Sequence, residues 1–270
     1  MTPPRATTRT ALLNQKGGVG KTTTTLHLGG ALAAAGRRVL LVDMDPQANL
    51  TRALGVGLLD HQDGRTLPKA MLGHKDDPDY ALSLVREHSP GLHVIPASYD
   101  LLSLCRQLYT ARSAEDRLDW VLEHLDSRYD HVLVDCRPAL EIDTDCVLRW
   151  ADDVLVPVEL DTTSIDAVKL LTAQVHSIST DARQQPPAYR GLVINLIPQG
   201  RPTKYRVRMR EAFHSLPVPV VGEIPIRDSL VQAKDKHQTI HQYDPTSDAA
   251  AMYTAMATTA GYLTEGTTTT

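Results

Sequence analysis

Short, almost wholly apolar runs alternate along this chain with longer stretches in which apolar residues recur every three or four positions. Strands that are covered on both faces read as near-continuous apolar runs, because no position along them meets water. The short runs therefore predict strands at Thr10–Asn14, Val39–Asp43, Leu92–Pro96, His131–Asp135, Val154–Val158, Leu192–Leu196 and Val220–Ile224. The longer stretches predict helices, among them Thr22–Ala35, Leu101–Leu125, Thr163–Thr180 and Thr203–His214. This alternation indicates an α/β fold with a mostly parallel central sheet and helices on both faces.

The chain has 270 residues, which is enough for one large domain, and we expect that domain to span residues 10–263. Residues 1–9 and 264–270 are small and polar, so we predict disordered tails at both ends. The stretch Gly55–Ser89 is the least patterned part. It is too short and too polar for a second domain, and it predicts either a small helical excursion or a mobile loop.

Composition narrows the classes of function. Three cysteines, Cys105, Cys136 and Cys146, are scattered without a C-x-x-C pair. This spacing argues against zinc, an iron–sulfur cluster or a disulfide framework, and it fits a reducing cytoplasm. There is no run of 18 apolar residues and no apolar N-terminal segment, so neither a membrane span nor a signal peptide is predicted. The net charge is −4, so any DNA affinity has to come from a local patch.

The most informative segment is Asn14–Thr23, which reads NQKGGVGKTT between the first predicted strand and the first predicted helix. Glycines let the backbone approach phosphate oxygens, while the N–H groups of the turn and the helix dipole attract anions. Lys21 is expected to reach the β- and γ-phosphates, and the Thr22 hydroxyl to bind Mg²⁺. The segment therefore predicts a P-loop.

Carboxylates follow two of the predicted strands. Asp43 and Asp45 end one strand in the segment DMDPQAN, and Asp135 ends the apolar run His131–Asp135. Carboxyl ends of parallel strands meet at one edge of a sheet, so these acids are expected beside the P-loop. Asp-Pro also opens turns, and many buried strands end in Asp, so each segment alone has a purely structural interpretation.

The segment K-G-G-V-G-K-T resembles the deviant Walker A motif of the ParA/MinD superfamily of ATPases. A standard P-loop has glycine at position 15, where this chain has Gln15, and it lacks a lysine like Lys16. The resemblance implies that Lys16 reaches across a nucleotide-sandwich dimer to the ATP of the partner; the alternative is a solvated loop lysine. D-x-D-P-Q-x-N resembles the family's switch I region, which implies that Asp45 orients the attacking water and Asp43 supports the Mg²⁺ water shell.

Further family features are implied at other strand ends. Asp135 occupies a Walker B position and would hold Mg²⁺ through water, Asn195 would read the adenine edge, and Pro225 would flank the base. Arg137 departs from the family pattern after the Walker B strand; it is either an extra cation near the γ-phosphate or dimer interface, or a surface arginine replacing a turn proline. The full set of nucleotide-binding residues that we expect is Gly17, Gly18, Val19, Gly20, Lys21, Thr22, Thr23, Asn195 and Pro225. Catalytic roles are expected for Lys16, Lys21 and Asp45.

A basic stretch follows the sixth predicted strand. Read as a helix, it places Tyr205, Met209, Ala212 and Phe213 on one apolar face with cations on both borders. The stems of these arginines can simply cover a buried stripe, or the cations can contact the phosphate backbone of DNA. The expected DNA-binding residues are Arg201, Lys204, Arg206, Arg208, Arg210 and Arg227, with Lys234 and Lys236 as the next candidates.

The resemblance covers nearly the whole chain and implies a ParA-type partition ATPase that uses ATP and Mg²⁺. It implies an ATP-dependent homodimer, non-specific DNA binding, a ParB-type centromere-binding partner, and a cytoplasmic, nucleoid-associated location. One alternative is a MinD-like positioning ATPase, which needs a basic amphipathic helix at the C-terminus where this chain reads TEGTTTT. The other is a metabolic P-loop enzyme, which needs a pocket for a small acceptor and has no use for Lys16.

Overall fold

The computed structural model describes residues 7–59, 64–74, 76–179 and 186–264. Its strands form one eight-stranded sheet in the order β3-β4-β2-β5-β1-β6-β7-β8. Neighbouring strands are parallel except at the β3–β4 pair, which is antiparallel. The strands are β1 Thr8–Leu12, β2 Val39–Asp43, β3 Arg86–Ser89, β4 Leu92–Ile95, β5 His131–Asp135, β6 Asp153–Val158, β7 Ala188–Ile197 and β8 Val220–Pro225.

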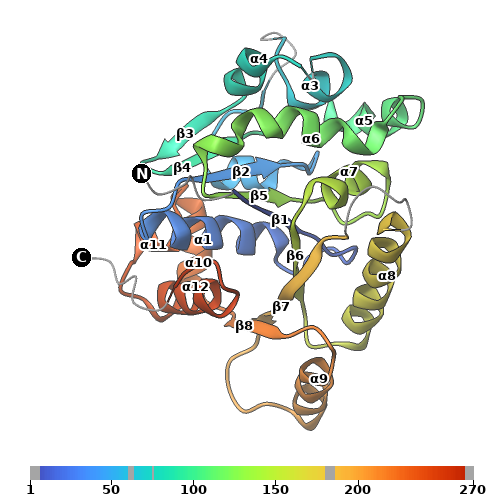
Figure 1. Cartoon of the computed structure of the whole chain (residues 1–270). Coiled ribbons are helices and arrows are strands. Elements are labelled where there is room, and N and C mark those ends of the chain that lie inside the picture. The colour runs from blue at the N-terminus through green and yellow to red at the C-terminus, as the bar shows by residue number, and fades with distance from the viewer. Residues whose placement is uncertain (1–6, 60–63, 75, 180–185, 265–270) are drawn as a thin grey trace.

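Helices cover both faces of this sheet, as the sequence predicts (Figure 1). The α-helices are α1 Lys21–Ala34, α2 Asn49–Ala53, α3 Leu67–Gly73, α4 Pro78–Ser83, α5 Leu101–Leu108, α6 Arg117–Leu122, α7 Ile142–Trp150, α8 Thr162–Ser179, α9 Lys204–His214, α10 Asp228–Asp235, α11 Ile240–Tyr243 and α12 Asp248–Thr259. Two 3₁₀ segments, η2 Ala114–Asp116 and η3 Glu123–Arg128, flank α6.

Alternate residues of each central strand enter two separate hydrophobic cores. In β2, Val39 and Leu41 pack on the side of α1 and α12, whereas Leu40 and Val42 pack on the side of α5 to α7. All of these side chains are fully buried. Because both faces are covered, no position along the strand can be polar without a partner, which explains the unbroken apolar runs in the sequence.

Three boundaries predicted from the sequence are wrong. Strand β1 begins at Thr8, inside the predicted N-terminal tail, because the Thr8 N–H donates to the Asp130 carbonyl and Arg9 forms an ion pair with Asp119. The predicted helix 101–125 is broken after α5, where Ser113 adopts a left-handed φ of 47°. The predicted strand 192–196 is the C-terminal half of β7, which begins at Ala188.

The unpatterned stretch Gly55–Ser89 is not a plain loop where the structure describes it. It contains α3, α4 and the edge strand β3. Thr66 and Asp77 each cap the helix that follows with a side-chain oxygen, and a proline stands in the first turn of both helices. These capping signals were present in the sequence. Residues 60–63 and 75 of this stretch lie outside the described residues.

The topology gathers the carboxyl ends of the central strands. Strand β1 lies between β5 and β6, so the loop after Leu12 emerges beside both of them. Asp43 of β2 is directly in register with Asp135 of β5. The P-loop and both predicted acids therefore meet at one edge of the sheet, which is where ligands bind in parallel α/β folds.

Candidate active site

The P-loop adopts a glycine-dependent turn immediately before α1. Gly18 and Gly20 have φ values of 79° and 85°, in the left-handed region that side chains disfavour. A Cβ atom on Gly20 would lie 2.8 Å from Asn195 Nδ2, so glycine is also required there for packing. On Gly17 or Gly18 the same atom would meet nothing within 4 Å. These two glycines thus face open space that a phosphate can approach.

Lys21 occupies the first residue of α1 and turns back over the loop. Its Nζ atom donates hydrogen bonds to the carbonyl oxygens of Asn14 at 2.9 Å and Lys16 at 3.0 Å. Burial lowers the pKa of Lys21, against the opposing attraction of Asp135. The ammonium is thus held above the loop by backbone acceptors, and phosphate oxygens are stronger acceptors of the same bonds.

Thr22, Asp43 and Asp135 form the predicted metal site. The Thr22 hydroxyl donates to Asp135 Oδ2 at 2.7 Å, and both Asp43 and Asp135 are fully buried. Burial raises the pKa of Asp135, and repulsion from Asp43 adds to the rise. A hydroxyl and carboxylates are the hard oxygen ligands that Mg²⁺ prefers, and a cation here would relieve the repulsion between the buried acids. The residues present therefore fit a magnesium site.

Asp43 acts mainly through its neighbours. Its Oδ2 accepts from the Thr51 N–H at 2.8 Å and from the Thr51 hydroxyl at 2.6 Å, while Oδ1 accepts from the Asp45 N–H at 3.2 Å. These bonds hold the segment after β2 against the site. They also leave Asp43 little free capacity for direct ligation, and its support of the Mg²⁺ water shell stays a prediction.

Asp45 forms the turn that its Asp-Pro segment indicates, and it also lines the cavity at the P-loop. Its Oδ1 accepts from the Gln47 N–H at 2.8 Å, which is a local turn bond of the kind that Asp-Pro segments form. The same residue lines a cavity of about 360 Å³ together with the P-loop residues Gly17, Lys21 and Thr22. The turn therefore presents the carboxylate to the space in front of the P-loop.

Lys16 points away from this cavity. Its Nζ atom forms ion pairs with Glu159 at 2.7 Å and with Asp161, both at the end of β6. Burial alone would lower the pKa of Lys16, but hydrogen bonds to Asp161 and Glu159 outweigh it and raise the pKa. Lys16 is thus held within its own subunit by two acids, and it is not the free loop lysine that the alternative interpretation requires.

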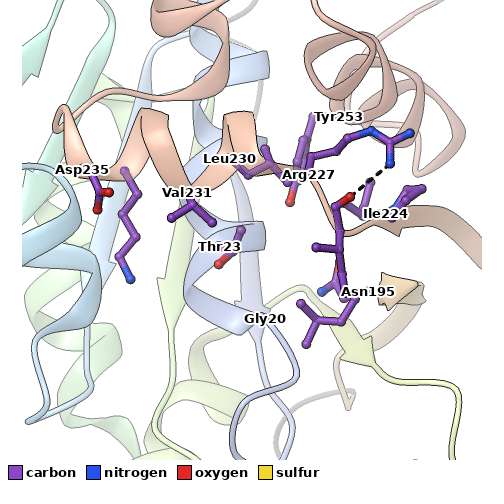
Figure 2. Close-up of a pocket in the computed structure, with 13 residues that line it drawn as sticks. Gly20, Thr23, Asn195, Ile224, Arg227, Leu230, Val231, Asp235 and Tyr253 are labelled. Carbon is purple, nitrogen blue, oxygen red and sulfur yellow. Dashed lines mark hydrogen bonds between the residues drawn. The ribbon is translucent and has the colours of Figure 1, made fainter. Parts of the chain in front are cut away.

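A second, more apolar cavity of about 260 Å³ adjoins the P-loop (Figure 2). Its walls carry Leu196, Ile226 and Val231, which are 42%, 44% and 58% exposed. The predicted base-flanking Pro225 also lines it. Exposed apolar side chains around a small cavity match the flat, apolar faces of a nucleobase.

Asn195 reaches this cavity because β7 is irregular at that point. The pairing of β7 with β8 shifts register between Ile194 and Ile197, and Leu196 adopts a left-handed φ of 55°. Asn195 Nδ2 donates to the Val19 carbonyl at 2.9 Å and to the Thr24 hydroxyl at 3.0 Å. The amide donor therefore braces the P-loop, and the amide oxygen is the atom that a base edge can meet.

The departure at Arg137 has a structural explanation that neither sequence interpretation anticipated. The guanidinium turns toward α5 and α7, where Nε donates to Asp143 at 2.7 Å, and Nη2 contacts Cys105 Sγ at 3.2 Å and Glu141. The three side chains have metal-ligand chemistry and lie close together, but their common partner is the guanidinium. Arg137 is thus half-buried and ties the loop after β5 to two helices, instead of facing the phosphates.

The predicted DNA-binding cations divide into two groups. In the first group, Arg201, Lys204 and Arg208 are exposed and Arg206 is partly buried, and none of the four forms an ion pair with any residue that the structure describes. Arg210 is paired with Glu223 at 2.8 Å. Arg227 is paired with Asp248 at 2.8 Å and lines the apolar cavity, away from α9. DNA contact by Arg227 therefore stays a prediction, and its ion pair with Asp248 would have to open for it.

Helix α9, which carries Lys204, Arg206, Arg208 and Arg210, lies beyond the β8 edge of the sheet (Figure 1). Met209 and Phe213 of α9 are buried, whereas Tyr205, one turn earlier on the same face, is 49% exposed. The buried face is narrower than expected, so more of α9 is open to solvent. No helix among the described residues is long and apolar enough to cross a membrane.

A glycine-rich turn that opens a helix, with buried acids at the ends of neighbouring parallel strands, defines a P-loop NTPase fold. The sequence profile of a family described as "AAA domain" matches residues 7–186. The chain is 31% identical over 260 residues to sporulation initiation inhibitor protein Soj of Bacillus subtilis, covering 92% of this chain and 95% of that protein. It is 38% identical over 170 residues to chromosome partitioning protein ParA of Caulobacter vibrioides, a match that covers 62% of either protein.

The chain therefore belongs to the ParA/Soj family of AAA-domain proteins, which confirms the resemblance noted in its motifs. A solved structure of cobyrinic acid a,c-diamide synthase from Mycobacterium smegmatis, with an ATP analogue and magnesium, is 28% identical and superposes with a TM-score of 0.76. That match covers 92% of this chain and 91% of the other. The fold is thus shared by proteins named for partition and by one named for a metabolic reaction.

Several residues of the site were not found from the sequence. Gln47, Asn49 and Pro138 line the cavity at the P-loop, and Lys234 lines both cavities. Gln47 and Asn49 belong to the D-x-D-P-Q-x-N segment, so that motif was the available signal. Lys234 follows no motif, because only the packing of α10 over α1 brings it to the site.

Proposed function

We propose that this chain is a ParA-type partition ATPase that binds Mg²⁺ and ATP, closes into a sandwich dimer and hydrolyses ATP. The observation that carries the proposal is that two lysines five residues apart point in different directions. Lys21 turns over its own P-loop, whereas Lys16 projects out of it to the acids at the end of β6. A lysine directed out of its own phosphate site can serve the phosphates of a second subunit.

The remaining residues have defined places in that reaction. Thr22 and Asp135 would hold Mg²⁺, which neutralises charge on the phosphates when it is bound. Asp45 lies in front of the P-loop and would position the attacking water. Asn195 and Pro225 would receive the base beside the P-loop. Phosphoryl transfer needs this kind of positioning and charge neutralisation more than covalent participation by the protein.

DNA binding would use the exposed cations of α9. Dimerisation doubles that surface and makes the attachment bivalent, which can raise avidity by roughly 10²–10⁴. Arg208→Ala should lower affinity and reduce the salt dependence, because each phosphate contact contributes a slope of about −0.9 in log affinity against log salt. Arg210→Ala is the matched control, since Glu223 already neutralises Arg210. An Arg208→Ala protein with wild-type affinity and salt dependence would remove this face of α9 as the contact surface.

The test of the whole proposal is ATP turnover by the purified chain with Mg²⁺, with and without DNA and a centromere-bound ParB-type protein. We expect slow basal turnover, stimulation that needs both additions, and dimers in ATP by sedimentation. Lys21→Ala should lose nucleotide binding, whereas Lys16→Ala should retain binding and lose both the dimer and turnover. A Lys16→Ala protein that dimerises and turns over like wild type would contradict the proposed role of Lys16.

A metabolic enzyme is the second candidate, favoured by the structural match to a protein named as a cobyrinic acid a,c-diamide synthase. Such an enzyme would need a small acceptor and would respond to neither DNA nor the partner. Turnover that depends on a small acceptor, with no response to DNA, would therefore select this candidate.

A further inference from the structure

The two cavities beside the P-loop meet at Gly20, Thr23 and Lys234, which line both of them. Gly20 and Thr23 belong to the P-loop and the first turn of α1. Lys234 comes from the last turn of α10, more than two hundred residues farther along the chain. Among these three residues, Lys234 alone carries a charge. It therefore marks the junction between the apolar cavity and the cavity at the P-loop.

The charge of Lys234 is not neutralised by the part of the chain that the structure describes. Lys234 is exposed and takes part in none of the ion pairs found among the described residues. The other cations nearby are engaged: Arg227 with Asp248, and Lys16 with Glu159 and Asp161.

The field of Lys234 also reaches α1. Burial, with smaller contributions from the charges of His241 and Lys234, lowers the pKa of His27 to about 3. Lys234 also lines the cavity at the P-loop together with Lys21, Thr22 and Thr23, the first residues of α1, so its charge lies near the start of that helix. A cation at the N-terminal end of a helix adds to the positive end of the helix dipole, and both attract an anion.

We propose that Lys234 binds the α-phosphate of the nucleotide, at the point where the sugar leaves the base cavity and the phosphates enter the P-loop. This inference rests on the proposed nucleotide binding. A base in the apolar cavity and β- and γ-phosphates at Lys21 leave the sugar and the α-phosphate at the junction. Lysine provides a mobile point charge with three donors, which suits a phosphate reached from across a cleft.

This location gives Lys234 a defined energetic role. The α-phosphate is common to AMP, ADP and ATP, and its charge changes little during transfer of the γ-phosphoryl group. Lys234 should therefore stabilise bound nucleotide and the transition state about equally, which lowers KM without raising kcat. The sequence had placed Lys234 among the reserve candidates for DNA contact, and the cavity geometry moves it to the nucleotide.

The experiment compares Lys234→Gln, Lys234→Arg and the control Lys236→Gln by calorimetric titration with MgADP, and by competition with AMP and adenosine. Lys236 is an exposed cation two residues farther on, and it lines neither of the two cavities. We expect Lys234→Gln to weaken ADP and AMP by roughly threefold to tenfold, with adenosine unchanged, as for one partly exposed charge-assisted hydrogen bond. Lys234→Arg and Lys236→Gln should stay within about twofold of wild type.

Three results would overturn the inference. In the first, Lys234→Gln binds ADP as tightly as wild type does. In the second, Lys236→Gln weakens ADP binding as much as Lys234→Gln does. In the third, Lys234→Gln weakens DNA binding and leaves the ADP affinity unchanged. The last result would return Lys234 to the DNA surface. Failure of the wild-type protein itself to bind MgADP or MgATP would instead refute the proposed function, so the two failures are distinguishable. Because Lys234 is exposed, unfolding midpoints of the variants should match wild type and show that folding is intact.

Discussion

Glu159 offers a direct test of whether the ion pairs of Lys16 oppose dimerisation. Glu159 Oε2 lies 2.7 Å from Lys16 Nζ, and Lys16 must leave this partner to reach a second subunit. Glu159→Gln removes the charge and keeps the shape of the side chain. Asp161 is a poorer choice, because its Oδ1 also accepts the Ser164 N–H at the start of α8. We therefore expect Glu159→Gln to favour the ATP-bound dimer without disturbing the helix.

The magnitude follows from the exposure of the pair. The side chains of Lys16 and Glu159 are 24% and 30% exposed, so solvent screens their attraction considerably. Such a pair contributes about 0.5–1 kcal/mol. Wild type breaks two such pairs when two subunits associate, and Glu159→Gln breaks neither. The dimer of the variant is therefore more stable than that of wild type by about 1–2 kcal/mol. Since 1.4 kcal/mol corresponds to a factor of ten, the dimer dissociation constant should fall by roughly fivefold to thirtyfold.

Sedimentation velocity with a slowly hydrolysed ATP analogue would measure this constant over a range of protein concentrations. Asp166→Asn is the matched control, since Asp166 forms an exposed pair with Lys169 on α8 and touches neither cavity. High salt should shrink the difference between Glu159→Gln and wild type, because it screens the pair that the variant lacks. A dissociation constant of Glu159→Gln equal to that of wild type, at low salt, would refute the reasoning.

Three further predictions concern the acids beside the P-loop and the ion pair of Arg137 with Asp143. Asp45→Ala should lower the rate of phosphate release by roughly 100-fold and preserve the dimer. Asp45→Asn keeps an oxygen that can accept the turn hydrogen bond. If both variants lose the same amount of activity, the effect belongs to the carboxylate and not to the turn. Burial raises the pKa of Asp135, so in Mg²⁺-free buffer the folded protein keeps a proton that the unfolded chain loses above about pH 4. Thermal stability should then decline as pH rises from about 4 toward the raised pKa, and Asp135→Asn should flatten that decline in scanning fluorimetry. Arg137→Ala leaves the Asp143 carboxylate without its cationic partner, although the Asp143 side chain is only 8% exposed. The free energy of unfolding measured in urea should therefore fall by about 2 kcal/mol. Arg137→Lys keeps the positive charge, so its free energy of unfolding should fall by less.

The sequence was most informative where local chemistry and burial coincide. The strand from Val39 to Asp43 was predicted with its bounds intact, because complete burial forces every residue to be apolar until the terminal acid. The edge strand β3, Arg86–Ser89, was missed because it is half-exposed and consists of polar residues. Edge strands pair on one side only, so packing does not impose an apolar pattern on them.

Side-chain partners across the fold could not be predicted in the same way. The partners of Arg137 lie on α5 and α7. The Asn195 amide donates hydrogen bonds to Val19 and Thr24, which precede it by more than 170 residues. Each depends on how helices pack on the sheet, and neither leaves a periodic signature in the sequence. A motif fixes the type of residue at a site, whereas tertiary packing decides which atoms of that residue remain free for a ligand.

The same distinction bears on how the proposed dimer would be coupled to nucleotide binding. Lys21 donates to backbone carbonyls, Thr22 to Asp135, and Lys16 to the acids at the end of β6. In the proposed reaction, each of these groups would exchange an internal partner for a phosphate, a metal ion or a second subunit. The exchanges of Lys21 and Thr22 can occur in one subunit, because their new partners enter the P-loop cavity. The exchange of Lys16 cannot occur within one subunit, because its ammonium points out of that cavity. Under the proposed function, a nucleotide would bind to a monomer and leave Lys16 paired, and the break of that pair would belong to the dimerisation step.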